Sequence, residues 1–207
     1  MNVVRIWVVL AVFMAAIVPF CLAAAAEEGA VAPPSGFRSL LSGKDLAGWQ
    51  EKGKAPEHWS MQDGTLVYDG KGADLRTVEK FENFIILVDW KVPPNGNSGV
   101  FLRDSTQVEI NDADKPPRKI WGGTTGGLYP EKPPVKRAAK PAGEWNHYEI
   151  SVEKGVITVK LNGETTVDHY EKNWGKTKSG PIGLQNHGSP LWFRNIFVKP
   201  LPNGEQK

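Results

Sequence analysis

Three residue types capable of acid–base or anion-binding chemistry occur close together in one stretch of the chain, NSGVFLRDSTQVEIND (residues 97–112). The alternation of side chains predicts two strands, Ser98–Arg103 and Gln107–Asn111, joined by a short turn at Asp104-Ser105. If the apolar side chains of this hairpin face a core, three polar ones become neighbours on its outward face: Arg103, Gln107 and Glu109. Together they could hold a polar ligand, and the carboxylate could act as a general base. The alternative is a cross-strand Arg–Glu pair that only decorates the sheet and contributes less than about 1 kcal/mol.

Further candidate residues lie at the ends of other predicted strands. His187 and Gln185 share one face near the end of their strand, His147 lies at a strand start, and Lys91 lies near a strand end. A single histidine at a strand end is more often structural than catalytic. Beside a polar face that already holds Glu109, however, an imidazole could serve as a general base or acid.

A long segment rich in proline, glycine and lysine, Asp112–Gly143, follows the polar hairpin. A loop of this length inside a compact domain is usually either functional or disordered. Its Trp121 and Tyr129 stand beside glycine pairs, which favours an ordered loop that places aromatic rings over a site. The alternative is a floppy insertion. Three acidic residues, one in the preceding hairpin turn and two at the start of this segment, could also form an oxygen-rich cation site, although their spacing is not diagnostic: Asp104, Asp112 and Asp114.

The elements that must position these residues read as short strands separated by Gly, Asn and Asp turns. The segment His58–Tyr68 predicts a hairpin that turns at Asp63-Gly64. Phe84–Val92 is apolar on nearly both faces, which predicts a central strand. A short helix around Gly72–Lys80 is the one helical element that the pattern allows. The other predicted strands are Glu144–Glu153, Val156–Leu161, Glu164–Asp168, Pro181–His187 and Leu191–Val198. This pattern predicts a single all-β domain, a sandwich or jelly roll.

The N-terminus has the layout of a secretory signal peptide. Arg5 precedes an apolar run from Ile6 to Leu22, and a run of alanines ends at Ala26. We therefore predict a signal peptide over residues 1–26, a linker over 27–36 and a secreted or periplasmic protein. The alternatives are a membrane anchor that is not cleaved and lipidation at Cys21.

Composition excludes several classes of function. The single cysteine lies in the predicted signal peptide, so the mature chain would have no disulfide, thiol nucleophile or cysteine metal site. With 25 Lys and Arg against 23 Asp and Glu, and no basic tract, nucleic acid is not an expected partner. The motifs of nucleotide-binding loops, zinc proteases and serine hydrolases do not occur. The chain holds eight tryptophans, and aromatic faces suit sugar rings as well as protein cores.

Nine segments of the chain, taken in order, resemble the 3-keto-disaccharide hydrolase domain family, also called 3-keto-glycoside 1,2-lyase/hydratase domains. They are FRSLLSGKDLAGW, WSMQDGTLV, FIILVDWKV, NSGVFLR, QVEIND, GGLY, PAGEWNHYEI, LNGETTVD and GPIGLQNHGSPLWFRNIFV. The resemblance implies a concanavalin A-like β-sandwich (jelly roll) of two antiparallel sheets over residues 37–201, secretion and saccharide substrates. One departure is that many members carry Glu-x-Gln-x-x-Asp where this chain has Gln107-x-Glu109-x-x-Asp112.

The resemblance also implies a reaction, in which a ketone at C3 of a sugar acidifies the hydrogen on C2. A base removes that hydrogen, the enolate is stabilised, the glycosidic oxygen leaves C1, and water can then add. The catalytic candidates for these roles are Glu109, His187 and Arg103. The candidates for substrate binding are Gln107, Gln185, Lys91, Trp121, Tyr129 and His147; Tyr129 or His147 could also protonate the leaving oxygen.

Two further expectations concern partners. A divalent cation could assist Arg103 at the enolate, and an upstream sugar oxidoreductase could supply the 3-keto substrate. No membrane insertion is expected after the signal peptide is cleaved. The competing functional class is a carbohydrate-binding, lectin-like module without catalysis, because one fold can host both. A structural domain of the cell envelope is a third alternative.

Overall fold

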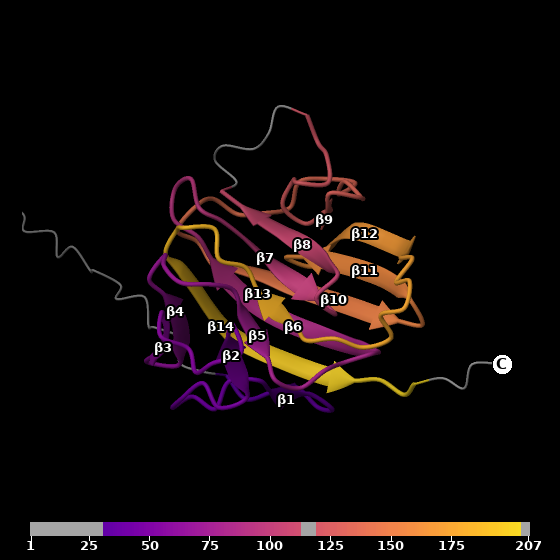
Figure 1. The fold of residues 1–207 in the computed structure, drawn as a ribbon. Coiled ribbons are helices and arrows are strands. Elements are labelled where there is room, and N and C mark those ends of the chain that lie inside the picture. Colours follow the sequence, from indigo (N-terminus) through magenta and orange to yellow (C-terminus); the bar gives the residue numbers. More distant parts are fainter. Residues whose placement is uncertain (1–30, 113–118, 204–207) are drawn as a thin grey trace, which may run out of the picture.

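The structure, a computed structural model, describes residues 31–112 and 119–203, and within these ranges the chain forms strands and no helix. Two antiparallel sheets pack face to face as the two layers of a sandwich (Figure 1). The predicted signal peptide and residues 27–30 of the predicted linker lie outside the described residues. No described helix is long and apolar enough to cross a membrane. The prediction of an all-β sandwich is confirmed.

The first sheet contains eight strands, in the order β12-β11-β10-β6-β14-β4-β3, with β1 also paired to β14. Its central strand β6 (Phe84–Lys91) alternates buried and half-buried residues, so one face meets the core and the other faces outward. The central position predicted for this strand is therefore confirmed. The remaining strands of this sheet are β1 (Arg38–Ser39), β3 (Trp59–Gln62), β4 (Thr65–Tyr68), β10 (Asn146–Glu153), β11 (Val156–Leu161), β12 (Glu164–Glu171) and β14 (Leu191–Pro200).

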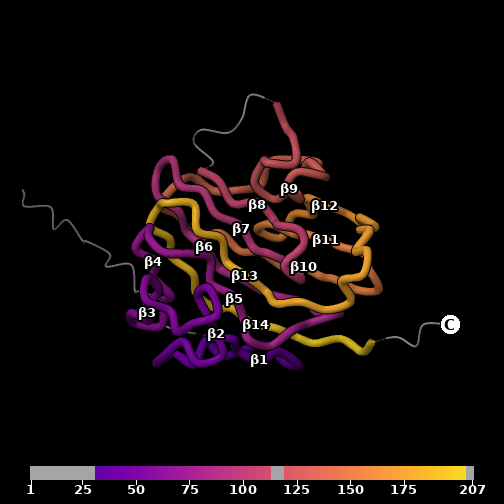
Figure 2. The backbone as a smooth tube through the Cα atoms, viewed as in Figure 1, coloured from indigo at the N-terminus to yellow at the C-terminus, as the bar shows by residue number. Residues whose placement is uncertain are grey.

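The second sheet contains six strands, in the order β2-β5-β13-β7-β8-β9. Figure 2 shows how β13 passes between β5 and β7, although more than 70 residues separate it from either in sequence. The strands are β2 (Trp49–Glu51), β5 (Leu75–Thr77), β7 (Asn97–Leu102), β8 (Thr106–Asn111), β9 (Leu128–Tyr129) and β13 (Gly183–Leu184). Strand β5 occupies the stretch where a short helix was predicted, so that prediction is wrong: pairing with β2 and β13 decides its conformation.

The core lies between the sheets. Strands β7 and β8 contribute Val100, Leu102, Val108 and Ile110, all fully buried, against the inward residues of β6 and β10. Burying each such side chain stabilises the fold by about 1.5–3 kcal/mol. Among the inward residues, Tyr148 of β10 also donates a hydrogen bond across the sandwich, and the acceptor is the backbone carbonyl of Glu109, 2.5 Å away. The core thereby fixes the backbone of the residue that was predicted to do chemistry.

The hairpin turn between β7 and β8 differs from the prediction in one consequential way. Strand β7 ends at Leu102, and both Arg103 and Asp104 adopt left-handed backbone conformations, with φ of 52° and 56°. The amide of Ser105 donates to the carbonyl of Leu102 at 3.1 Å, which closes a β-turn whose two central residues both have positive φ, as in a type I′ turn. Because a left-handed residue breaks strand alternation, Arg103 does not continue the face of Gln107 and Glu109.

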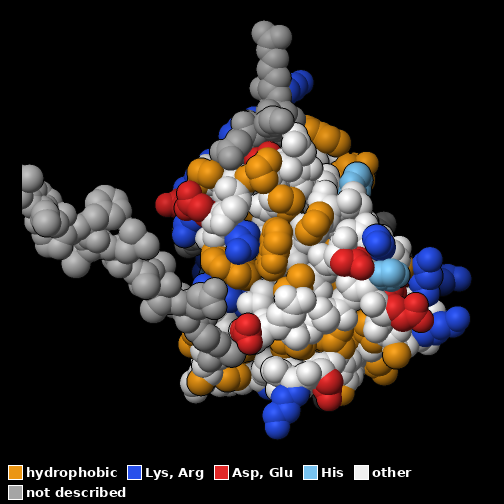
Figure 3. Space-filling model, turned by 90° about the vertical axis from the view of Figure 1, so that its left-hand side faces the viewer, with side chains coloured by type: hydrophobic (Ala, Val, Ile, Leu, Met, Phe, Trp, Pro, Cys, Tyr) orange, Lys and Arg blue, Asp and Glu red, His pale blue; other side chains and the backbone are white. Residues whose placement is uncertain are grey.

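One end of the sandwich is seen in surface view in Figure 3, where Lys and Arg side chains alternate with Asp and Glu. Hydrophobic side chains occupy small groups between them, and no continuous basic tract crosses this face.

Candidate active site

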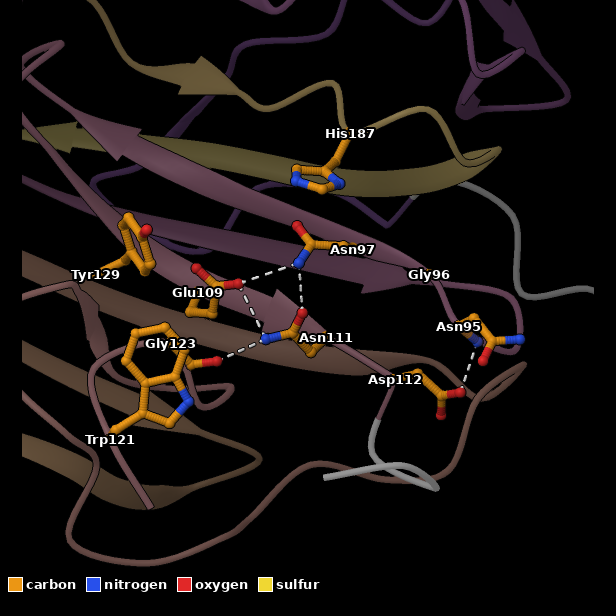
Figure 4. A pocket seen from close by; sticks show the side chains of 10 residues that line it. All are labelled: Asn95, Gly96, Asn97, Glu109, Asn111, Asp112, Trp121, Gly123, Tyr129 and His187. Atoms are coloured by element: carbon orange, nitrogen blue, oxygen red, sulfur yellow. Dashed lines mark hydrogen bonds between the residues drawn. The ribbon is translucent and has the colours of Figure 1, made fainter. Parts of the chain in front are cut away.

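A cavity of about 510 Å³ opens on the outward face of the second sheet, where β7 begins and β8 ends (Figure 4). Its walls combine amide side chains, two buried carboxyl groups, a histidine and two aromatic rings. The lining residues are Asn95, Gly96, Asn97, Glu109, Asn111, Asp112, Trp121, Gly123, Tyr129 and His187.

Glu109 lies at the centre of this cavity and is held by three amide side chains. Its Oε1 accepts hydrogen bonds from the side-chain amides of Asn111 at 2.9 Å and Asn97 at 3.4 Å, and its Oε2 accepts one from Gln107 at 2.9 Å. The register of the hairpin explains the arrangement, because Asn97 stands opposite Asn111 and Gly99 stands opposite Glu109. The carboxyl group is thus fixed in orientation.

The surroundings of Glu109 bring the pKa of its carboxyl group close to neutral pH. Burial raises the pKa of Glu109 from 4.5 to about 7, because the side chain is only 4% exposed and its charge is poorly solvated. The hydrogen bonds from Asn111, Gln107 and Asn97 oppose this effect, since they favour the ionised form. A carboxylate with a pKa near 7 is suited to general acid–base catalysis at neutral pH.

The amides around Glu109 form a continuous network. Asn111 also donates to the carbonyl of Gly123 at 2.8 Å and accepts from Asn97 at 2.6 Å. On the other side, Gln107 donates to the Oε1 of Gln185 at 3.1 Å. The predicted association of Gln107, Gln185 and Glu109 is therefore present, although the two glutamines lie beside the cavity rather than on its wall.

Trp121 and Tyr129 form an aromatic wall next to Glu109. Their rings meet edge to face at 5.7 Å between centroids, and each side chain remains 46% exposed. The indole lies against the backbone of Gly123, where an added Cβ would come within 2.3 Å of a ring atom. The described part of this loop, from residue 119 onward, contains β9, which pairs with β8, so an unstructured insertion does not fit that part. The rings offer an apolar surface to a ligand beside a polar group.

His187 lies on the side of the cavity next to Asn97, across Glu109 from the aromatic wall (Figure 4). It belongs to an exposed loop rather than to a strand, because β13 ends at Leu184. Asn186 fixes that loop: its backbone amide donates to Asp74 at 2.8 Å and its side chain donates to the carbonyl of Gly72 at 2.9 Å. The expectation that an imidazole shares a hollow with Glu109 is met.

Arg103 does not join Glu109, so the predicted neighbourhood of these two residues is wrong. Its guanidinium lies 4.3 Å from the centre of the Trp174 ring, and its Nη2 donates to the carbonyl of Glu82. The side chain is buried at the far end of the hairpin, next to the turn whose left-handed backbone redirects it. Arg103 has a packing role at this position and is not placed to stabilise an enolate in the cavity.

Lys91 and His147 also lie away from Glu109, because β6 and β10 belong to the other sheet and these residues face outward from it. The ammonium of Lys91 lies 5.0 Å from the ring centres of both Trp145 and Trp192. The Nδ1 of His147 is 2.6 Å from Asp89, beside a second cavity of about 490 Å³. The prediction that Lys91 and His147 bind the same ligand as Glu109 is therefore wrong, because both lie on the outward face of the opposite sheet.

The suggested acidic cation site is not assembled from the residues that the structure describes. Asp104 lies in the turn before β8 and pairs with Arg76 at 2.7 Å, whereas Asp112 follows the other end of β8 and accepts from the amide of Asn95 at 2.6 Å. The six residues between those ends span about 20 Å. Asp114 lies outside the described residues. Within those residues, no group of three or more His, Cys, Asp or Glu side chains could hold a metal ion.

Asn97 and Asn111 are the two residues of the candidate site, both hydrogen-bonded to Glu109, that were not among the site residues predicted from sequence. Asn111 has the same strand parity as Gln107 and Glu109, which is a usable signal. Asn97 could be found only after the hairpin register was fixed, because the turn length decides which residue of β7 stands opposite Asn111.

Comparison with known proteins agrees with the fold described above. A 3-keto-disaccharide hydrolase of Bacteroides thetaiotaomicron is 30% identical, over 80% of this chain and 79% of that protein. A candidate glycosyl hydrolase of Parabacteroides distasonis superimposes with a TM-score of 0.70 at 31% identity, covering 81% of this chain and 85% of that one. A β-glucanase of Bacillus licheniformis, at 16% identity and a TM-score of 0.51 over 74% and 92% of the two chains, shares the fold alone.

The sequence profile of the 3-keto-alpha-glucoside-1,2-lyase-like domain family matches residues 36–199, which is most of the chain. The nine sequence segments described above fall within this match. The chain therefore belongs to the 3-keto-alpha-glucoside-1,2-lyase-like domain family, which confirms the resemblance found in the sequence and makes the protein a hydrolase or lyase.

Proposed function

We propose that the protein cleaves 3-keto-glycosides by elimination across C1 and C2, with Glu109 as the general base, and that water then adds to the product. The observation that carries this proposal is the buried carboxyl group of Glu109, with a pKa of about 7, at the centre of an open cavity. The hydrogen on C2 of a 3-keto sugar is acidified by the neighbouring carbonyl, so a base of moderate strength can remove it. A lectin-like module would have no need for such a base.

The other walls of the cavity supply the remaining roles. His187 faces the same space as Glu109, so its imidazole is the candidate donor to the enolate oxygen, in place of Arg103. The hydroxyl of Tyr129 is the candidate donor to the leaving oxygen at C1. Trp121 presents an indole surface to the sugar ring, whose C–H faces are apolar.

The proton and electrons balance in this scheme. The electron pair of the C2–H bond forms the enolate, and the proton moves to Glu109. Collapse of the enolate forms the C1–C2 double bond, and the C1–O bond breaks with its electron pair on the leaving oxygen, which takes a proton. Addition of water to the enone then gives the same net products as hydrolysis.

The reaction is tested by incubating the purified protein with a 3-keto-glucoside and following enone absorbance and release of the leaving group. We expect turnover by the wild-type protein and loss of about two to four orders of magnitude in Glu109→Gln, the range typical of removing a general base. Glu153→Gln, at the exposed end of β10, is the matched control and should keep full activity. Unchanged turnover in Glu109→Gln would remove Glu109 from the mechanism.

Two arms of the same experiment address the remaining expectations. Adding a chelator tests the predicted divalent cation: turnover that falls with chelator and returns with added metal would support it. Replacing the substrate with the unoxidised disaccharide tests the lectin-like alternative, because a binding module would bind this sugar tightly and turn over neither compound.

We also propose that the reaction takes place outside the cytoplasm, supplied with 3-keto sugars by an oxidoreductase. The basis is the signal-peptide pattern of residues 1–26. N-terminal sequencing of the protein from the periplasm or medium should find a chain that begins near Glu27, whereas retention of the apolar run in the membrane fraction would contradict export by cleavage.

A further inference from the structure

The two carboxylate oxygens of Glu109 differ in what they can still accept. A carboxylate oxygen offers about two lone-pair directions. Within the described residues, Oε1 already accepts two amide hydrogen bonds, from Asn111 and Asn97, whereas Oε2 accepts one, from Gln107. Oε2 is therefore the oxygen with acceptor capacity left for a proton from a substrate.

The side-chain amide of Gln107, which donates to Oε2 of Glu109, also donates to a second side chain. The Nε2 of Gln107 donates to Glu109 at 2.9 Å and to the Oε1 of Gln185 at 3.1 Å, and the side chain is buried. A carboxamide has two N–H groups, so turning it over would cost both of these bonds. Gln185 is itself fixed, since its backbone amide donates to the carbonyl of Gly99 at 2.9 Å.

Gly99 makes room for this arrangement. It stands directly opposite Glu109 in the hairpin, and a Cβ added there would lie 2.4 Å from the Cγ, Cδ and Nε2 of Gln107. The backbone of Gly99 is not left-handed, so the requirement for glycine at this position is one of space and not of conformation. The Gln107 side chain occupies the volume that any larger residue at position 99 would fill.

We propose that Gln107, seated over Gly99 and oriented by Gln185, is a positioning residue that directs the proton taken from the substrate to Oε2 of Glu109. This inference rests on the proposed function of Glu109 as the base. Gln107 is not assigned a contact with the substrate and acts only through Glu109: it fixes the rotation of the carboxylate and donates to the oxygen that receives the proton. Without this donor the ionised form loses stabilisation and the carboxylate gains rotational freedom.

The experiment is an NMR titration of the purified protein labelled with ¹³C at the glutamate carboxyl carbons, with the Glu109 signal identified by its loss in Glu109→Gln. Gln107→Met keeps the length of the side chain and removes its amide. In this variant we expect the midpoint of the Glu109 pH titration to rise by about half to one pH unit, because the ionised carboxylate loses a hydrogen-bond donor. Gly99→Ala, which displaces the same amide, should raise it in the same direction. Gln62→Met, on the exposed edge strand β3, is the matched control and should leave it unchanged.

Kinetics supply the second readout. In Gln107→Met the acidic limb of the kcat/KM profile with a 3-keto-glucoside should move to higher pH together with the NMR titration midpoint, because both report the free protein. At a pH above both midpoints, kcat should fall about tenfold or more, with little change in KM. A midpoint of Glu109 that stays within about 0.2 pH units of wild type in Gln107→Met overturns the inference. The titration decides this even if the wild-type protein turns over no 3-keto sugar, an outcome that would count against the proposed function instead. If Gly99→Ala does not fold, Gln107→Met carries the test.

Discussion

Glu109 should make the stability of the protein depend on pH in a predictable direction. The folded protein holds this carboxyl with a pKa of about 7, whereas the same group in an unfolded chain titrates near 4.5. Between these two values the folded state binds more protons than the unfolded state, so stability must fall as the pH rises through this window and must level off above it. At about 1.4 kcal/mol for each pH unit between the two values, the loss amounts to about 3 kcal/mol.

Glu109→Gln removes the titrating carboxyl group, so comparing this variant with wild type isolates the contribution of Glu109 to the pH dependence of stability. The neutral amide faces the same donors from Asn111 and Gln107, so the substitution carries a cost of its own, because one of these donors then meets an N–H group. That cost does not depend on pH. The free energy of unfolding of the variant, measured relative to wild type, should therefore rise by about 2–3 kcal/mol between pH 5 and pH 8.

Urea denaturation followed by tryptophan fluorescence at pH 5, 6, 7 and 8 gives these free energies directly, provided that the slopes with denaturant agree between the two proteins. Glu153→Gln serves as the control and should track wild type at every pH. Parallel curves for wild type and Glu109→Gln, constant within about 0.5 kcal/mol, would show that the carboxyl is ionised throughout and would refute its buried, near-neutral state.

Three further predictions follow from the site. The kcat/KM for a 3-keto-glucoside should rise with pH and level off above a midpoint near 7, because Glu109 must be ionised to act as a base; a midpoint near 4.5 in a pH-rate profile would contradict this. Trp121→Ala should raise KM for a 3-keto-disaccharide about tenfold, as expected for losing about 1–1.5 kcal/mol of ring stacking, with a smaller effect on a 3-keto methyl glycoside; equal effects on the two substrates would place the second sugar elsewhere. Arg103→Met should lower the free energy of unfolding by about 1–3 kcal/mol through loss of its contacts with Trp174 and Glu82, while kcat stays near that of wild type; a large loss of kcat in folded protein would restore Arg103 to the mechanism.

The strand pattern made most of the fold predictable from sequence. The alternation in β6 and in the β7–β8 hairpin has a period of two, and this period alone decides which residues enter the core. The same parity placed Gln107 and Glu109 on one outward face. The short helix failed because β5 holds its conformation through pairing with strands that are distant in sequence, which local propensity does not register.

Residues of the site could be predicted from sequence only where strand alternation or the composition of a loop indicated their position. Arg103 was misplaced because a residue at the edge of a turn can adopt a left-handed backbone, which breaks alternation at that one position. Lys91 and His147 were misplaced for another reason: parity gives a face but not the sheet, and both face outward from the opposite sheet. Trp121 and Tyr129 were found from loop composition, since aromatic residues among glycines suggest ordered placement.

The central claim, that Glu109 removes a proton from C2, is tested most directly with a 3-keto-glucoside carrying deuterium at C2. The account predicts a primary isotope effect on kcat in the wild-type protein, exchange of C2 hydrogen with solvent, and the loss of both exchange and turnover in Glu109→Gln. Turnover without an isotope effect or exchange at C2, with release of the leaving group intact, would mean direct attack at C1 and would contradict the account.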